Sequence, residues 1–397
     1  MPLCAQLTVS GLFDSTVSFR AGAADAPAFS YGIEEYANFR FQARRDWGNF
    51  YGAVNLFAAA GDFAADAQLM AGTAALTGTS GQGLSFSPYI SGDNYIAAIE
   101  LERLYFRFNL NAIDIDAGLF RLPFGYGQVW GPSDFLNPKN PLKPDARPRG
   151  ILGAGLSWYP IDGTDFKVLG FGAAPRDPFS RQGSGGYMGL SLDYHWKIAS
   201  VQALYSFESP HGNFSKGIHH TGLSVKADVV VGLVMDALYT YNAQAHTGHE
   251  GLSFSAGADY SFFDSRLIVL AEYLYNGAAS STAFDLNNNL FGMSNEHYLY
   301  TGLTWRFSDF TNVSIALISG FTDVSFTPLV TFNQELFQGA TLIVSAQVPM
   351  DRDLFSGNGK RGELGPIPPD ALQPLLPVNG QRMGRYFDFS AKIRLRF

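Results

Sequence analysis

The chain has 397 residues, of which 46% are hydrophobic, 15% aromatic and 16% charged, whereas about 25% of the residues of an average soluble protein are charged. The net charge of −8 contains no block of like charges, which excludes a basic nucleic-acid-binding surface. The single cysteine, Cys4, excludes a disulfide within the chain and a cysteine-based zinc site. With 43 glycines and 19 tyrosines, the composition favours an all-β protein with many turns and an apolar surface.

The first residues, MPLCAQLTVSG, lack the basic region and the long apolar run of a complete secretory signal peptide. They fit two interpretations: an ordinary start, or residues 1–5 as the remnant of a removed signal. The longest apolar run, VVVGLVM at 229–235, is shorter than the ~18 residues that a membrane helix needs.

Apolar and polar residues alternate along most of the chain, which is the periodicity of β-strands. In TVSGLFDSTVSF (8–19), Val9, Phe13 and Val17 share one face and Asp14 lies on the other. The pattern predicts eighteen strands, with sixteen as the lower bound, and the strand at 326–336 is the weakest because Pro328 removes a hydrogen-bond donor. The predicted strands are 7–20, 33–45, 49–60, 94–108, 113–122, 150–159, 164–173, 186–196, 198–208, 217–227, 229–241, 250–262, 265–276, 296–307, 311–320, 326–336, 339–348 and 385–397.

The links between these strands alternate between short and long, as in 46–48 followed by 61–93, and 109–112 followed by 123–149. A closed antiparallel sheet with tight turns at one end and long loops at the other produces this alternation. Sixteen to eighteen strands enclose an aqueous channel that side chains cannot fill. The polar face must therefore point inward and the apolar face must be solvated by lipid.

Aromatic and charged residues agree with this orientation. Trp47, Trp158, Trp196 and Trp305 lie beside short links, and tyrosines 205, 239, 241, 273 and 275 lie near the opposite strand ends, as expected for the two membrane interfaces. Charged residues fall on the polar phase of their strands. IELERLYFRF (99–108) conflicts, because Glu102 and Arg103 are adjacent; either a β-bulge restores the alternation or two strands meet there.

The closing strand FDFSAKIRLRF alternates sharply and ends on an aromatic residue. It resembles the C-terminal assembly signal of porin-type outer-membrane β-barrels of Gram-negative-type bacteria, and the whole chain resembles this class. The resemblance implies a single barrel domain over 1–397, insertion in the outer membrane beside lipopolysaccharide or its equivalent, and recognition by the barrel-assembly machinery. The residues in the places of the signal are Phe387, Phe389, Ile393, Leu395 and Phe397.

Two proline-rich stretches are predicted to be long loops. Residues 349–384 are expected to form an extracellular loop, either a cap on the barrel or a polyproline-like surface arm. Residues 123–149 are expected either to fold into the channel as a constriction or to form a stiff lid outside it. The constriction candidates are Trp130, Asp134, Lys139, Lys143, Arg147 and Arg149.

Charged residues of the polar phase are candidates for solute selection. They either create a transverse field that sorts solutes by charge, or pair with their cross-strand neighbours. The candidates are Arg40, Arg44, Glu100, Glu102, Arg103, Arg107, Asp388, Lys392, Arg394 and Arg396.

An enzyme is disfavoured, because the seven histidines form no HExxH motif and no GxSxG elbow is present. His219 and His220 are adjacent and so point to opposite faces of a strand. The sequence therefore predicts a passive channel for small hydrophilic solutes, monomeric or homotrimeric, without cofactors. The alternatives are an adhesin or ligand-binding barrel acting through its long loops, and a transporter or exporter of a larger or hydrophobic substrate.

Overall fold

The computed structural model describes the chain except residues 1–5, 23–28, 63–88, 138–149, 161–164, 175–184, 211–215, 243–247, 278–294, 322–323, 349 and 351–385. Most of the predicted long loops, including nearly all of 349–384, therefore lie outside the described residues. Within the described ranges, no helix is both long and apolar enough to cross a membrane.

The described residues form nineteen strands and one short 3₁₀ helix, η1 (His249–Gly251). The weakest predicted strand, 326–336, is present as β17, and Pro328 lies within it. The strands are β1 (Gln6–Gly22), β2 (Phe29–Arg45), β3 (Gly48–Gly61), β4 (Tyr89–Gly92), β5 (Tyr95–Leu110), β6 (Ile113–Phe120), β7 (Ile151–Trp158), β8 (Asp165–Ala173), β9 (Tyr187–Trp196), β10 (Ala199–Glu208), β11 (Ile218–Asp228), β12 (Gly232–Asn242), β13 (Leu252–Phe262), β14 (Leu267–Asn276), β15 (His297–Ser308), β16 (Thr311–Gly320), β17 (Ser325–Phe337), β18 (Ala340–Gln347) and β19 (Tyr386–Arg396).

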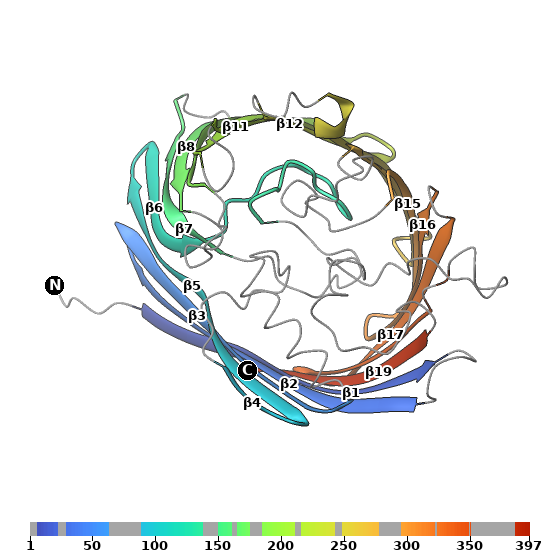
Figure 1. The fold of residues 1–397 in the computed structure, drawn as a ribbon. Coiled ribbons are helices and arrows are strands. Elements are labelled where there is room, and N and C mark those ends of the chain that lie inside the picture. The colour runs from blue at the N-terminus through green and yellow to red at the C-terminus, as the bar shows by residue number, and fades with distance from the viewer. Residues whose placement is uncertain are drawn as a thin grey trace.

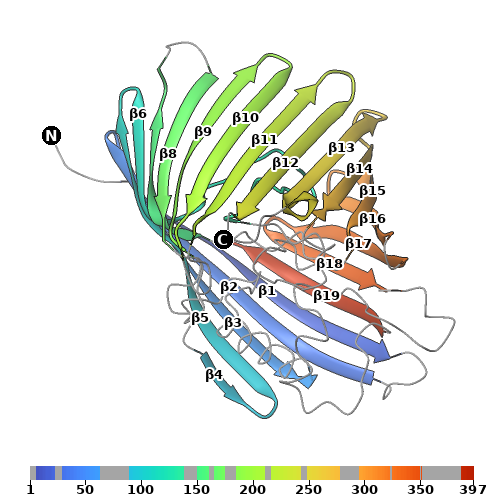
Figure 2. The same cartoon turned by 45° about the horizontal axis from the view of Figure 1, so that its top comes forward.

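The sheet closes on itself, because β1 pairs antiparallel with both β2 and β19. Figure 1 looks along the resulting barrel. β3 pairs directly with β5, and in the described chain β4 pairs only with β5, at the end of that strand that β6 does not reach (Figure 2). Eighteen of the nineteen strands therefore form the closed wall, which confirms the predicted all-β barrel.

The two faces of the wall have opposite character. On β1, Leu7 and Val9 point outward and are 66% and 65% exposed, whereas Asp14 and Thr16 point into the ring and are 5% and 8% exposed. The same inversion continues around the ring. The barrel is thus apolar outside and polar inside, the arrangement that a lipid-solvated wall requires.

The irregular stretch in β5 is a β-bulge. Ala53 of β3 faces Arg103 and the next residue, Val54, faces Leu101, so that Glu102 is the extra residue. The bulge returns Leu104 and Phe106 to the outer face. Of the two predicted alternatives the bulge is correct, since β5 is one continuous strand.

Four of the five tryptophans lie at the end of the barrel where the short links are, which we call the short-link end. Trp47 lies in the turn between β2 and β3, Trp158 and Trp196 end β7 and β9, and Trp305 lies close to the end of β15. All four side chains are exposed on the outside of the barrel. This position fits an indole ring at a membrane interface, with its body in lipid and its N–H near water.

The closing strand β19 pairs with β1 and β18. Beyond it, Phe397 exchanges two backbone hydrogen bonds with Gly11, at 2.7 and 3.2 Å. The Phe397 ring lies directly over Gly11, where a Cβ atom would approach ring carbons to 2.2 Å. Phe387, Ile393, Leu395 and Phe397 are exposed on the outer face, so the terminal residue is part of the seam that closes the ring.

Candidate channel and its inner wall

The chain leaves the barrel wall after Phe120, the last residue of β6, and residues 121–137 lie inside the ring of strands (Figure 1). We refer to residues 121–137 as the inward segment. The part of the predicted loop 123–149 that the structure describes, 123–137, belongs to it. The segment lies against β10–β14, which we call the segment wall.

Glu272 on β14 binds the inward segment through its carboxylate. The residue is fully buried. Its carboxylate accepts hydrogen bonds from three consecutive backbone N–H groups, those of Gln128 at 3.0 Å and of Val129 and Trp130 at 2.9 Å. Each hydrogen bond to a charged acceptor contributes about 1.5–3 kcal/mol, so one side chain can hold this turn of the segment.

Further contacts fix the segment along its length. Gly125 has a φ of +74°, and a Cβ atom there would approach the Asp236 carboxylate to 2.2 Å, so both its conformation and the available space require glycine. Further hydrogen bonds join the segment to other strands: Gly125 N–H to Gln202 Oε1 at 2.6 Å, Gln128 Nε2 to Asp259 Oδ1 at 2.6 Å, Ser133 Oγ to the Ala237 carbonyl at 3.1 Å, and Ser224 Oγ to Ser133 Oγ at 3.3 Å.

Apolar side chains of the segment are buried in two clusters. Trp130 is completely buried with Leu274 and Tyr298, at one end of the segment wall. Phe124 and Phe135 are buried in a larger cluster, which also contains Phe120, Leu122, Leu136, Ile151, Leu169, Phe171, Ala173, Tyr187, Leu204 and Leu238. Burying each large apolar side chain contributes about 1.5–3 kcal/mol, so the segment is packed as a part of the wall.

Asp134 holds the segment to itself. Its Oδ2 atom accepts a hydrogen bond from Arg121 at 2.7 Å, and its Oδ1 atom accepts one from the Phe124 N–H at 3.3 Å. Asp134 is 1% exposed. The two constriction candidates within the described residues, Trp130 and Asp134, are thus buried inside the segment and do not reach its water-facing side. Lys139, Lys143, Arg147 and Arg149 lie outside the described residues.

On the other side of the barrel, β19, β1, β2, β3 and β5 meet where the ring closes; we call these strands the closure wall. Arg394 donates two hydrogen bonds to Asp14, at 2.9 and 2.8 Å, and Lys392 lies 3.7 Å from the same carboxylate. Asp14 and Arg394 are direct cross-strand partners. Ring closure creates this contact between residues 380 positions apart in the sequence.

Two more arginines near this wall also pair across strands. Arg107 donates to Asp116 at 2.7 and 2.9 Å, and Arg20 donates to Asp388 at 2.9 Å. These residues, like Arg394, form the cross-strand pairs that were one of the two predicted alternatives. Arg44 and Arg396 are exposed near the short-link end.

A buried polar network surrounds Glu100 and Glu102. Asn38 donates to Glu102 at 2.7 Å and to Asn55 at 2.6 Å, and Asn55 donates to Glu100 at 2.8 Å. The hydroxyl of Tyr36 also donates to Asn55, at 2.8 Å. Sequence reasoning missed both asparagines and the tyrosine, although all three lie on the polar phase, because it weighted charged residues alone.

Three arginines adjoin this network. Arg40 donates to Asn38, and Arg103 donates to the Glu102 carbonyl at 2.9 Å. Arg103 lies close enough to Arg121, at the base of the inward segment, for their like charges to repel each other. The closure wall and the inward segment therefore approach each other at Arg103 and Arg121, each with a carboxylate nearby.

The segment wall has its own buried acids besides Glu272. Asp236 is fully buried and accepts a hydrogen bond from Ser224 at 2.7 Å. Glu208 accepts from the Gly185 N–H at 3.0 Å and lies 3.3 Å from His220, whose ring stacks on Phe135. His219, on the opposite face as predicted, bonds the outer-face hydroxyl of Tyr205. The described residues contain no group of His, Cys, Asp and Glu side chains that could hold a metal ion.

Comparisons with known proteins support the fold. No family model matches the chain, and no curated protein matches its sequence. Among solved structures, a BenF-like porin from Pseudomonas fluorescens Pf-5 is 10% identical with a TM-score of 0.58, over 98% of both chains. OccK9 (OpdG) of Pseudomonas aeruginosa is 9% identical with a TM-score of 0.57, over 98% of both chains. OccAB1 of Acinetobacter baumannii is 11% identical with a TM-score of 0.56, over 98% of this chain and 96% of that one. At these identities the likeness shows the barrel fold.

Proposed function

We propose that the protein is an integral outer-membrane channel through which small hydrophilic solutes diffuse passively. The observation that carries the proposal is the inverted wall: eighteen strands form a ring that is apolar outside and polar inside, and a ring of this size leaves room for water. The likeness to solved porins supports it. The proposal includes no cofactor and no catalytic step.

The inward segment is proposed to narrow the water path. It occupies part of the ring's interior, and its buried aromatic residues and the contacts of Glu272 hold it against one side. Solutes would then pass between the inward segment and the closure wall, close to Arg40, Arg103 and Arg121.

The charged groups along this path are proposed to orient solutes more than to select one sign of charge. Arg103 lies beside Glu102, Arg121 binds Asp134, and Arg394 binds Asp14. Because cations and carboxylates alternate in this way, the local field is strong while the net charge is small. We expect weak ion selectivity in the unmodified protein.

Planar-bilayer recording tests the channel directly. The purified, folded protein is expected to produce discrete conductance steps, with a reversal potential near zero in a salt gradient. A folded barrel that inserts into the bilayer and never conducts would contradict the proposal.

The closing strand is proposed to be the part of the chain that barrel-assembly machinery binds. The assembled protein is proposed to be a monomer or a homotrimer. Phe397 covers Gly11 and lies 6.0 Å from Phe39 at the seam. Phe397→Ala is expected to lower the amount of barrel in bacterial outer membranes severalfold. The same variant refolded in detergent should recover the barrel, because the pairing of β19 with β1 uses the backbone. Equal amounts in cells would contradict the assembly role.

A further inference from the structure

The Glu35 carboxylate lies on the outer, apolar face of the barrel. Ser15, Glu35, Ala58, Ala97 and Ile90 stand in register across β1, β2, β3, β5 and β4. Their phase is that of the exposed outer residues, such as Val17 and Ile33. Glu35 therefore points away from the lumen, whereas its chain neighbour Glu34 points into it.

The height of Glu35 places it at the level of lipid headgroups. It lies ten residues before Arg45, the short-link end of β2. At about 3.3 Å per residue and a tilt of about 40°, ten residues span about 25 Å, which is the height of the apolar band of such barrels. His219 and His297, nine and eleven residues from the short-link ends of β11 and β15, hydrogen-bond tyrosine hydroxyls on the same outer belt.

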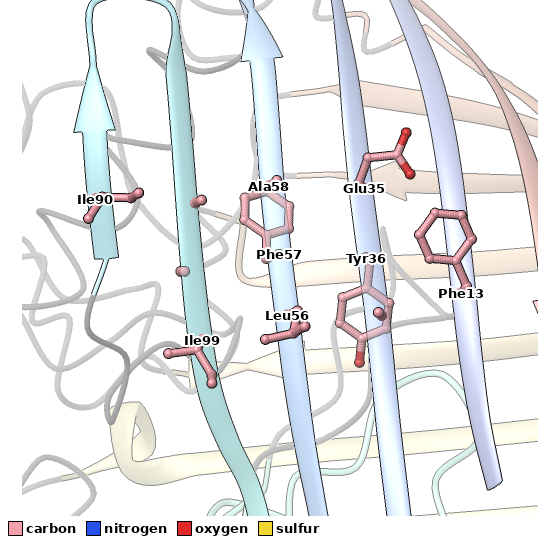
Figure 3. A pocket seen from close by; sticks show the side chains of 11 residues that line it. Phe13, Glu35, Tyr36, Leu56, Phe57, Ala58, Ile90 and Ile99 are labelled. Carbon is pink, nitrogen blue, oxygen red and sulfur yellow. The ribbon is translucent and has the colours of Figure 1, made fainter.

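A groove lies beside the carboxylate. It has a volume of about 580 Å³, and its small floor residues include Ala37, Ala58 and Ala97. Larger apolar side chains border it. Figure 3 shows the lining side chains spread across neighbouring strands, from Phe13 on β1 through Glu35, Leu56 and Ile99 to Ile90 on β4.

Only one oxygen atom of the Glu35 carboxylate has a hydrogen-bond partner among the described residues. Its Oε1 atom accepts a hydrogen bond from the Ser15 hydroxyl at 2.8 Å. Its Oε2 atom is shielded from solvent and has no hydrogen-bond partner among the described residues. A carboxylate at a lipid interface is costly unless a donor, and preferably a cation, completes its contacts.

We propose that Glu35 and this groove bind a lipid whose headgroup carries an ammonium group. A rotation of the Glu35 side chain exposes Oε2, the ammonium group donates to the carboxylate, and an acyl chain lies in the groove between Leu56, Ile99 and Ile90. The charge of Glu35 selects a cationic group, and its outward position at headgroup height selects a lipid. Among the described residues, the histidines at this level of the outer face, His219 and His297, already bind tyrosine hydroxyls, so a second copy of the chain fits less well than a lipid.

The inference rests on membrane insertion but not on conductance, so its test is a binding measurement. The full chain in detergent is mixed with phosphatidylethanolamine or phosphatidylglycerol, and the adducts are quantified by native mass spectrometry. The unmodified protein should retain about fivefold more phosphatidylethanolamine, as expected for one partly screened ion pair. Glu35→Gln should abolish this preference. The matched control is Glu34→Gln, which removes the adjacent carboxylate on the lumen face and should preserve it.

A second variant guards against an indirect effect of charge removal. Ala58→Leu fills the groove floor and keeps the carboxylate, and should lower phosphatidylethanolamine retention severalfold; resistance to denaturation by SDS at room temperature verifies that the barrel is folded. Equal retention of both lipids by the unmodified protein, or an unchanged preference in Glu35→Gln, overturns the proposal. So does a lipid-independent dimer that Glu35→Gln dissociates, since the groove would then belong to a second copy. A protein that binds the lipid as expected but never conducts would refute the channel alone.

Discussion

The segment wall and the closure wall carry the same inward-facing alternation of polar residues, but they use their carboxylates differently. On the segment wall, Glu272 accepts three backbone N–H groups of the inward segment. On the closure wall, Asp14 binds the guanidinium of Arg394, and Glu102 binds the amide of Asn38. One wall supports a piece of chain inside the barrel, and the other presents paired charges beside the proposed path.

The difference shows what a polar phase can and cannot reveal. In both walls, the alternation of apolar and polar residues along a strand determines that the carboxylate faces the lumen. The partner of each carboxylate depends on which part of the chain folds next to it. For Glu272 the partner is a backbone turn 142 residues away in the sequence, and for Asp14 it is a strand from the other end of the chain. If the two walls have separate roles, substitutions on them should have different effects.

Removing the inward segment should have the largest effect. Replacing residues 123–136 by a short Gly-Ser linker is expected to raise single-channel conductance severalfold, because the obstruction is lost while β6 and β7 still pair with each other along the wall. Shortening the predicted outer loop 349–384 is the control and should change conductance little. An intact barrel with unchanged conductance would show that the segment does not narrow the path.

Glu272→Gln should loosen the segment without deleting it. The amide has one acceptor oxygen and presents N–H donors toward backbone N–H groups, so docking of the segment should weaken by about 3 kcal/mol. Bilayer recordings should show frequent transitions to a larger conductance, and thermal unfolding should occur at a lower temperature. The control is Glu335→Gln on β17, outside the segment wall. A channel without such transitions and with unchanged thermal stability would contradict the assigned role of Glu272.

Neutralising charges beside the path should shift ion selectivity in opposite directions. Arg103→Gln is expected to favour cations and Glu100→Gln to favour anions, each changing the permeability ratio severalfold, because each leaves its partner's charge uncompensated. Reversal potentials in a salt gradient measure both. Lys226→Gln, at an exposed ion pair with Asp228 near the short-link end, is the control. Shifts of the same sign in Arg103→Gln and Glu100→Gln would disprove the paired-field model.

Asp388→Asn on the closure wall should have the smallest effect. Its ion pair with Arg20 is partly exposed, at 20% and 29% of the two side chains, and such pairs contribute less than about 1 kcal/mol. The midpoint of denaturant unfolding should shift only slightly. If Asp388→Asn lowered the stability of the barrel as much as Glu272→Gln does, the two walls would not differ in their roles.

The sequence by itself determined the closed antiparallel barrel, its strand number, its short-link end marked by tryptophans, and the orientation of its two faces. Each of these follows from a period of two residues and from the spacing of turns, which are local properties of the chain. Even the bulge at Glu102 was detectable, because two adjacent charged residues break the period locally.

Only the tertiary structure decided which groups meet inside and outside the ring. Trp130 and Asp134 were predicted as constriction candidates, and the structure buries both side chains. β4 was absent from the predicted strands because a four-residue strand is too short to carry a period. Glu35 lies on the apolar phase of β2. Only the structure shows that its carboxylate lies beside Ser15 and a groove that four neighbouring strands complete. Such contacts depend on registers between distant strands, and the alternation of one strand contains no information about its neighbour's register.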